Sequence, residues 1–233
     1  MYYYDIHTHR PALHPEVLAI VSVDIRKHFD LHYPVDVQFY AVGVHPWYID
    51  CNDPETTNAL FAKVCRLARH PEVKAIGETG LDKNTAKPAN DFLFQQELFV
   101  SHARLAEEVK KPLIIHCVKA WNELLTIRQS IKPAMPWIIH GFRGKPALAL
   151  QLIDAGLYLS FGIHYNIDSL KTAWEQHRLL LETDDKNIAI RDIYQQAANS
   201  LSISRQELAE KIEECIQRLM INDINDIRNI RNS

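Results

Sequence analysis

The chain has 233 residues with 26 basic and 29 acidic side chains, which gives a formal net charge of −3 at pH 7. Hydrophobic residues make up 47% and charged residues 24%, a globular balance that excludes a disordered chain, a collagen and a coiled coil. The slight acidity argues against a general nucleic-acid coat protein, which would be basic overall, but it allows a local basic patch around a site.

Targeting and redox signals are absent from the sequence. The N-terminal residues lack the basic start and apolar run of a signal peptide, and no apolar stretch approaches the roughly 20 residues of a membrane-spanning helix. The four cysteines form no C-x-x-C pair, so neither a disulfide framework nor a cysteine zinc site is indicated. A cytoplasmic protein without membrane contact is therefore expected.

Eight short β-rich runs alternate with longer helical patterns along the chain. Strands are expected at residues 2–6, 19–24, 39–44, 73–77, 113–116, 137–140, 157–161 and 179–182. Several of these runs are almost wholly apolar, as in strands that are buried on both faces of a parallel sheet.

Three of the intervening helices carry clear start or face signals. One follows Asp53 and Pro54, an N-cap and a proline at the first helical position. Another has apolar residues three or four apart between residues 98 and 109. A third follows the capping box of Ser204 and Glu207.

This alternation predicts the α/β class and a compact, irregular (β/α)₈ barrel of the TIM type. The barrel should be irregular because the connection between the first two strands is too short for a full helix. A doubly wound open sheet is the competing fold, but its glycine-rich phosphate fingerprint is missing. One domain covering residues 1–233 is expected, with 221–233 as either a helical extension or a frayed tail.

Polar side chains recur where the predicted strands end, and barrel enzymes place their active sites at this edge. The residues concerned are His7, His9, His45, Glu78, His116, His140 and Asp184. His7 and His9 are two apart on a strand, so both point to one face and can bind one ion. A lone buried histidine is more often bonded to the backbone, but chance does not place several at the same end of different strands.

Four imidazoles and two carboxylates at one barrel mouth predict a site for two divalent metal ions. Its expected ligands are His7, His9, Glu78, His116, His140 and Asp184. Glu78 is the expected shared ligand between the ions, which would activate a bridging water. Asp184 is expected to bind one ion and to accept the proton of that water. Asp5 either orients a ligand histidine or caps backbone amides.

The ordered motifs DIHTH, GVHP, AIGETGLD, PLIIHC, IIHGFRG and LLLETD resemble the TatD family of metal-dependent hydrolases, within the amidohydrolase superfamily. The resemblance implies an irregular (β/α)₈ barrel with divalent-metal-dependent deoxyribonuclease activity, including 3′-5′ exonuclease action. It implies the same six ligands, with His7 and His9 on the first ion and His116 and His140 on the second.

One departure concerns the residues that would hold the substrate. Val118 stands where family members commonly carry an arginine, and Lys119 could substitute only as a point charge. The candidate substrate contacts are His45, Trp47, Lys119 and Arg143, together with the strand-end cations Arg10, Lys83 and Lys145. For each cation taken alone, an ordinary solvated loop charge is favoured, and Arg143 is the preferred substrate contact because HGFRG places it next to His140. Trp47 is equally compatible with packing of its own loop.

The leading functional hypothesis is a deoxyribonuclease or 3′-5′ exonuclease that acts on DNA, as single strands or 3′ ends, with a metal-activated water. The alternatives are a small-molecule amidohydrolase or phosphoesterase with the same two-metal site, and a metal-binding protein whose catalysis has lapsed. Two divalent ions are expected, and a mixed histidine and carboxylate site accepts magnesium, manganese or zinc. No obligate protein partner is inferred.

Overall fold

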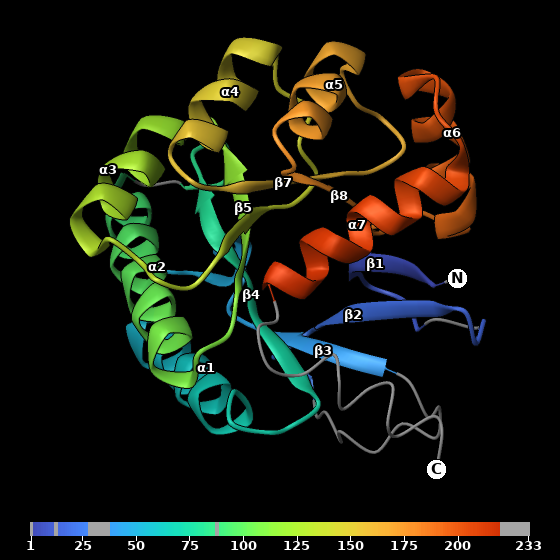
Figure 1. Cartoon of the computed structure of the whole chain (residues 1–233). Coiled ribbons are helices and arrows are strands. Elements are labelled where there is room, and N and C mark those ends of the chain that lie inside the picture. The colour runs from blue at the N-terminus through green and yellow to red at the C-terminus, as the bar shows by residue number, and fades with distance from the viewer. Residues whose placement is uncertain (1, 12–13, 28–37, 87–88, 220–233) are drawn as a thin grey trace.

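The computed structural model describes residues 2–11, 14–27, 38–86 and 89–219. These residues form one eight-stranded sheet in which neighbouring strands follow chain order and every pair is parallel (Figure 1). The strands are β1 (Tyr3–Thr8), β2 (Val17–Val23), β3 (Gln38–Val42), β4 (Val73–Asp82), β5 (Leu113–Val118), β6 (Trp137–Ile139), β7 (Tyr158–Phe161) and β8 (Leu179–Leu181). All eight predicted strands are confirmed.

Helices cover the outside of this sheet, and two more follow its last strand (Figure 1). They are α1 (Pro54–Leu67), α2 (Ala89–Val109), α3 (Trp121–Ile131), α4 (Pro146–Asp154), α5 (Ile167–Glu175), α6 (Ile190–Leu201) and α7 (Arg205–Leu219). A short 3₁₀ turn, η1 (Pro46–Tyr48), follows β3. Two predicted N-caps are present, since Asp53 accepts a hydrogen bond from the Thr56 N–H and Ser204 accepts one from the Glu207 N–H.

The main chain after β8 meets the end of β1 and nearly closes the sheet into a barrel. The Asp184 N–H donates to the His7 carbonyl at 3.0 Å, and the His9 N–H donates to the Asp184 carbonyl at 3.1 Å. This closure confirms the barrel over the open sheet. Among the described residues between β1 and β2 there is no helix, as the short connection predicted.

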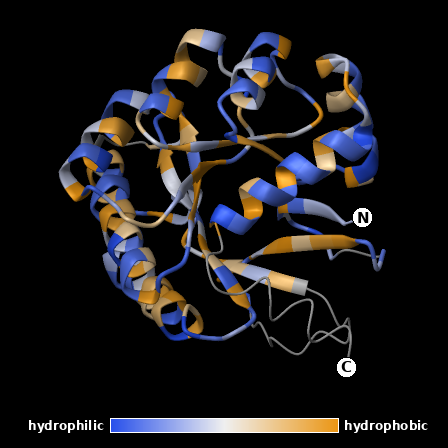
Figure 2. Ribbon diagram, viewed as in Figure 1, coloured by the Kyte–Doolittle hydropathy of each residue, from blue (hydrophilic) through white to orange (hydrophobic). Residues whose placement is uncertain are grey.

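Apolar strand residues fill the barrel and its contacts with the helices. Ile114, Ile138 and Leu180 are fully buried, and the rings of Phe99 on α2 and Trp137 on β6 pack edge to face. Figure 2 shows both hydrophobic and hydrophilic residues on the covering helices, as expected for helices with one face toward the strands. In the described part of the chain, no helix has the length and apolar character to span a membrane.

Strand β4 is longer than the sequence pattern suggested, and this changes the placement of Glu78. The strand was expected to end at residue 77, but it continues to Asp82 and pairs with β5 through Gly80 opposite His116. Gly80 has φ near +150°, and a Cβ there would lie 1.9 Å from the His116 carbonyl oxygen. Glu78 therefore lies within a paired strand rather than in the loop that follows it, whereas His116 lies in its strand as predicted. The expected tail at 221–233 lies outside the described residues.

Candidate metal centre

Glu78 is the centre of a group of histidines and carboxylates at the carboxyl ends of the strands. This group, called the Glu78 cluster below, consists of His7, His9, His45, Glu78, His116, His140 and Asp184. The Glu78 side chain is almost fully buried, and each of its two oxygens faces a different set of nitrogen atoms. The structure thus brings together all six residues that the sequence predicted as metal ligands, and His45 joins them.

The first set lies around Glu78 Oε2 and comes from the two ends of the barrel seam. The Nε2 atoms of His7 and His9 lie 3.3 and 3.5 Å from this oxygen. The same two nitrogens lie 3.7 and 3.6 Å from Asp184 Oδ1. His7, His9 and Asp184 each offer one ligand atom, and these atoms lie close enough together to hold one metal ion.

His7 does not have the contacts of an ordinary core histidine. Its side chain is fully buried, yet neither ring nitrogen has a hydrogen-bond partner among the described residues. His102 on α2 shows the satisfied alternative, with Nδ1 at 2.8 Å from the Leu98 carbonyl and Nε2 accepting from the Val44 N–H at 3.0 Å. Because unpartnered buried polar atoms are costly, the His7 nitrogens fit a site that binds a cation.

The second set lies around Glu78 Oε1. This oxygen lies 2.8 Å from His140 Nε2, 3.0 Å from His45 Nε2 and 3.1 Å from His116 Nδ1. The facing nitrogens of His116 and His140 are themselves only 3.2 Å apart. Glu78 therefore stands between two ligand sets, the arrangement that a carboxylate shared by two metal ions requires.

Two further carboxylates determine which nitrogens of these histidines carry protons. Asp82 Oδ2 lies 3.2 Å from His116 Nε2, and Glu182 Oε1 lies 3.4 Å from His140 Nδ1. A carboxylate only accepts, so each outer nitrogen donates and the neutral ring keeps its lone pair on the inner nitrogen. In the neutral rings the two inner nitrogens then carry no proton, and both face the Glu78 oxygen. Such a donor set fits a divalent metal ion.

The electrostatics of the cluster agree with a site built for positive charge. Burial opposes ionisation of Glu78, but the neighbouring His140 and His7 outweigh it and hold the pKa of Glu78 well below its ordinary value. Burial likewise opposes the charged ring of His140, but Glu78 and Glu182 raise the pKa of His140 well above its ordinary value. The buried carboxylates of Glu78 and Glu182 thus stay ionised. Their negative charge favours a cation in the site, either a protonated histidine or a metal ion.

His45 differs from the other histidines of the cluster. Its Nδ1 accepts a hydrogen bond from the Trp47 N–H at 3.1 Å, so the neutral ring carries its proton on Nε2. That nitrogen lies 3.0 Å from Glu78 Oε1 and donates to it. The sequence proposed His45 as a substrate contact, whereas the structure places its ring against Glu78.

The sequence interpretation missed Asp82 and Glu182. Both end apolar strand segments, in the motifs GLD and LLLE, and that position was the available signal. Glu182 is fully buried and also accepts from the Gly141 N–H at 2.7 Å. Asp82 also accepts from the indole N–H of Trp47 at 2.8 Å.

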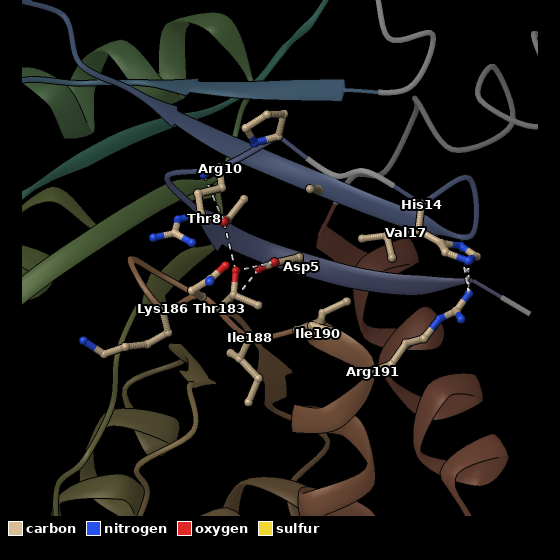
Figure 3. Close-up of a pocket in the computed structure, with 14 residues that line it drawn as sticks. Asp5, Thr8, Arg10, His14, Val17, Thr183, Lys186, Ile188, Ile190 and Arg191 are labelled. Atoms are coloured by element: carbon tan, nitrogen blue, oxygen red, sulfur yellow. Dashed lines mark hydrogen bonds between the residues drawn. The ribbon is translucent and has the colours of Figure 1, made fainter.

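Asp5 bonds to the main chain beside the cluster (Figure 3). Its Oδ1 accepts from the Thr183 N–H at 3.0 Å, and its Oδ2 lies 2.6 Å from the Thr183 hydroxyl, which in turn lies 2.9 Å from the Thr8 hydroxyl. Burial raises the pKa of Asp5 to about 7. Of the two roles expected for Asp5, the structure shows the bond to backbone amides, and among the described residues no bond from Asp5 to a histidine ring is present.

Asp5 and Thr183 also line a cavity of about 570 Å³ beside the β1–β8 seam (Figure 3). Its other described lining residues are half apolar and half polar, and the polar half includes Arg10, Lys186 and Arg191. No residue of the Glu78 cluster lines this cavity, so it is separate from the metal centre.

The predicted substrate contacts lie on loops around the barrel mouth. Lys119 directly follows β5 and Arg143 lies soon after β6; both are exposed, and neither has a side-chain partner among the described residues. Lys83 forms an ion pair with Glu123 at 2.5 Å, and Lys145 occupies the N-cap of α4. In the described structure none of these four cations contacts the Glu78 cluster.

Comparisons with known proteins agree with this geometry. The family model for the TatD related DNase matches residues 21–220. The uncharacterized metal-dependent hydrolase YcfH of Escherichia coli K12 is 31% identical over 212 residues, which are 82% of this chain and 77% of that protein. The 3′-5′ ssDNA/RNA exonuclease TatD of Klebsiella pneumoniae is 30% identical over 165 residues, or 66% of this chain and 59% of that protein.

Solved structures share the fold at lower sequence identity. The TatD homolog YJJV of Escherichia coli K12 superposes with a TM-score of 0.76 at 18% identity, covering 94% of this chain and 97% of that one. A hydrolase TatD family protein from Entamoeba histolytica gives a TM-score of 0.74 at 17% identity, covering 94% and 98% of the two chains. With most of its length matched by the family model, this chain belongs to the TatD-related DNase family of metal-dependent hydrolases.

Proposed function

We propose that the protein is a deoxyribonuclease that removes nucleotides from 3′ ends of DNA by hydrolysis, with two divalent metal ions in the Glu78 cluster. The observation that carries this proposal is the position of Glu78, whose two carboxylate oxygens face two separate ligand sets. The Klebsiella pneumoniae relative is named a 3′-5′ ssDNA/RNA exonuclease, which supports single-stranded DNA as the substrate.

Each ligand set is assigned to one ion. His7, His9 and Asp184 would hold the first, His116 and His140 would hold the second, and both ions would share Glu78. Two divalent ions, when bound there, would lower the pKa of a coordinated water and neutralise charge on a phosphate. The ligand set suits magnesium, manganese or zinc.

The chain's own residues supply the remaining steps. Asp184 is the only carboxylate of the Glu78 cluster whose side chain is partly exposed, at 25% against 5% for Glu78. It is therefore proposed to accept the proton of the attacking water. His45 holds the Glu78 carboxylate in place through its Nε2 proton. Lys119 and Arg143, free of carboxylate partners in the described structure, are proposed to attract the phosphates.

A small-molecule amidohydrolase or phosphoesterase is the second candidate. One observation favours it, because Val118 occupies the position after Cys117 where the TatD resemblance leads one to expect an arginine. In the described structure, none of the four loop cations Lys83, Lys119, Arg143 and Lys145 contacts the Glu78 cluster. A site that lacks a lysine or arginine positioned to bind phosphate would suit a compact substrate.

The test is degradation of single-stranded DNA labelled at its 5′ end, with magnesium, manganese and zinc in parallel. A ladder that shortens from the 3′ end, and disappears with chelator, is expected.

Two variants test the roles of the cluster carboxylates. Glu78→Gln should lose metal stoichiometry and activity together, whereas Asp184→Asn should keep part of its metal but lose turnover. Asp154→Asn, at an exposed position on α4, serves as the matched control. A wild-type protein that binds two metal ions and leaves DNA intact would refute the nuclease proposal in favour of a small-molecule substrate.

A further inference from the structure

Trp47 on η1 is an exposed indole that is fixed by its polar edge. Its side chain is 60% exposed, although its Nε1–H donates to Asp82 Oδ2 at 2.8 Å. Its ring lies edge to face with His45 at 4.8 Å between centroids and with His116 at 6.0 Å. An open aromatic face thus lies directly beside the second ligand set of the Glu78 cluster.

The backbone that carries Trp47 is tied firmly to the end of β4. Gln95 on α2 is almost fully buried, and its Oε1 accepts from the Asp82 N–H at 2.8 Å. Its Nε2 donates to the Pro46 carbonyl at 3.3 Å, which links η1 to the same point. The Trp47 N–H is bonded in turn to His45. The indole is therefore held in one orientation before any ligand arrives, which lowers the entropic cost of binding.

We propose that Trp47 is the stacking platform for a nucleobase whose attached phosphate lies at the Glu78 cluster. This inference rests on the proposed function, and it adds that the enzyme selects substrates bearing a planar base. Loop packing alone would bury the Trp47 ring against the protein, whereas here the side chain is mostly exposed despite its hydrogen bond to Asp82 and its contacts with two histidine rings. A base has a π-face of matching size, and stacking of this kind tolerates all four bases.

Because Trp47 also donates to Asp82, a substitution could act through His116 instead of through stacking. Trp47→Phe separates the two effects, since it keeps an aromatic ring and loses the hydrogen bond to Asp82. Trp47→Ala loses both. The comparison therefore uses two ligands that each carry a 5′-phosphate, one with a base and one without. A change at the Glu78 cluster affects the binding of both ligands alike, so it cancels in the ratio of their affinities.

The experiment measures equilibrium binding of deoxyadenosine 5′-monophosphate and of 2-deoxyribose 5-phosphate to the manganese-loaded protein by calorimetry. The wild type should bind the nucleotide about 5- to 150-fold more tightly than the sugar phosphate. Trp47→Phe should keep most of this preference, and Trp47→Ala should abolish it while leaving the sugar-phosphate affinity unchanged relative to Trp47→Phe.

Three results would overturn the inference: no preference in the wild type, a preference that survives in Trp47→Ala, or an equal loss of both affinities in Trp47→Ala. The proposed function fails separately, if the wild type leaves DNA intact. If the wild type leaves DNA intact but still prefers the nucleotide in a manner that depends on Trp47, base stacking on Trp47 is supported and the nuclease activity is not.

Discussion

Replacing Asp82 with asparagine tests whether this carboxylate controls the second ligand set. Asp82 accepts three hydrogen bonds, two on Oδ2 from Trp47 and His116 and one on Oδ1 from the Asn84 N–H. Asparagine has the same shape but only one accepting oxygen. It can therefore satisfy the donors on one side of the group but not those on the other.

Both orientations of the new amide carry a cost. If its oxygen takes the place of Oδ1, its NH₂ group faces His116 and forces the ring proton onto Nδ1, the nitrogen that points at Glu78. If its oxygen takes the place of Oδ2, the bond to the Asn84 N–H is lost and the His116 bond loses its charged acceptor. Loss of such a partner of a ligand histidine weakens metal affinity by about 10- to 100-fold, or about 1.4–2.7 kcal/mol.

Calorimetric titration of metal-free protein with manganese is the suitable assay. Asp82→Asn should weaken binding of one ion only, because Asp82 contacts none of His7, His9 and Asp184 in the described structure. Asp154→Asn, at the exposed control position on α4, should bind both ions as the wild type does. Unchanged affinities in Asp82→Asn, or equal weakening of both ions, would refute the assignment.

Three further predictions concern substrate binding, packing and pH. Arg143→Ala should raise KM for DNA several-fold with unchanged metal content, and a normal KM would reject its phosphate contact. Gly80→Ala should lower the free energy of unfolding by more than about 3 kcal/mol in urea titrations, because its Cβ would clash with the His116 carbonyl at positive φ. Gly162→Ala, whose Cβ would meet only ordinary contacts, is its control and should stay within about 1 kcal/mol. Burial lowers the pKa of His102 to about 4, so its contribution to stability is complete above pH 6.5 and should be lost as pH falls toward 4, by about 3 kcal/mol. His102→Gln should remove this part of the pH dependence in chelator-treated protein, and parallel curves for the two proteins would contradict the prediction.

Hydrophobic periodicity was sufficient to predict the strands of this barrel, because their apolar runs are buried on both faces. It was insufficient for the length of β4. The segment from Gly77 to Asp82 contains two glycines and two carboxylates, a composition typical of a loop. It remains a strand because Gly80 lets β4 approach the β5 backbone closely, a three-dimensional constraint that a one-dimensional pattern does not contain.

The convergence of the histidines was predictable for a different reason. A parallel barrel brings the carboxyl ends of all strands to one edge, so residues at those ends meet whatever their distance in sequence. The roles of Asp82 and Glu182 were not predictable in this way. They depend on which ring nitrogen each carboxylate faces, and spacing along a strand does not determine the orientation of a ring on the next one.

Residues of the candidate metal centre also close the barrel. The His7 carbonyl accepts from Asp184, the His9 N–H donates to Asp184, and Asp5 bonds to Thr183 across 178 positions of sequence. The side chains of His7, His9 and Asp184 converge at the same seam. A metal ion held there would bind the two ends of the sheet together, and any ligand that binds only the closed barrel stabilises it. The proposed first ligand set is thus assembled by barrel closure itself.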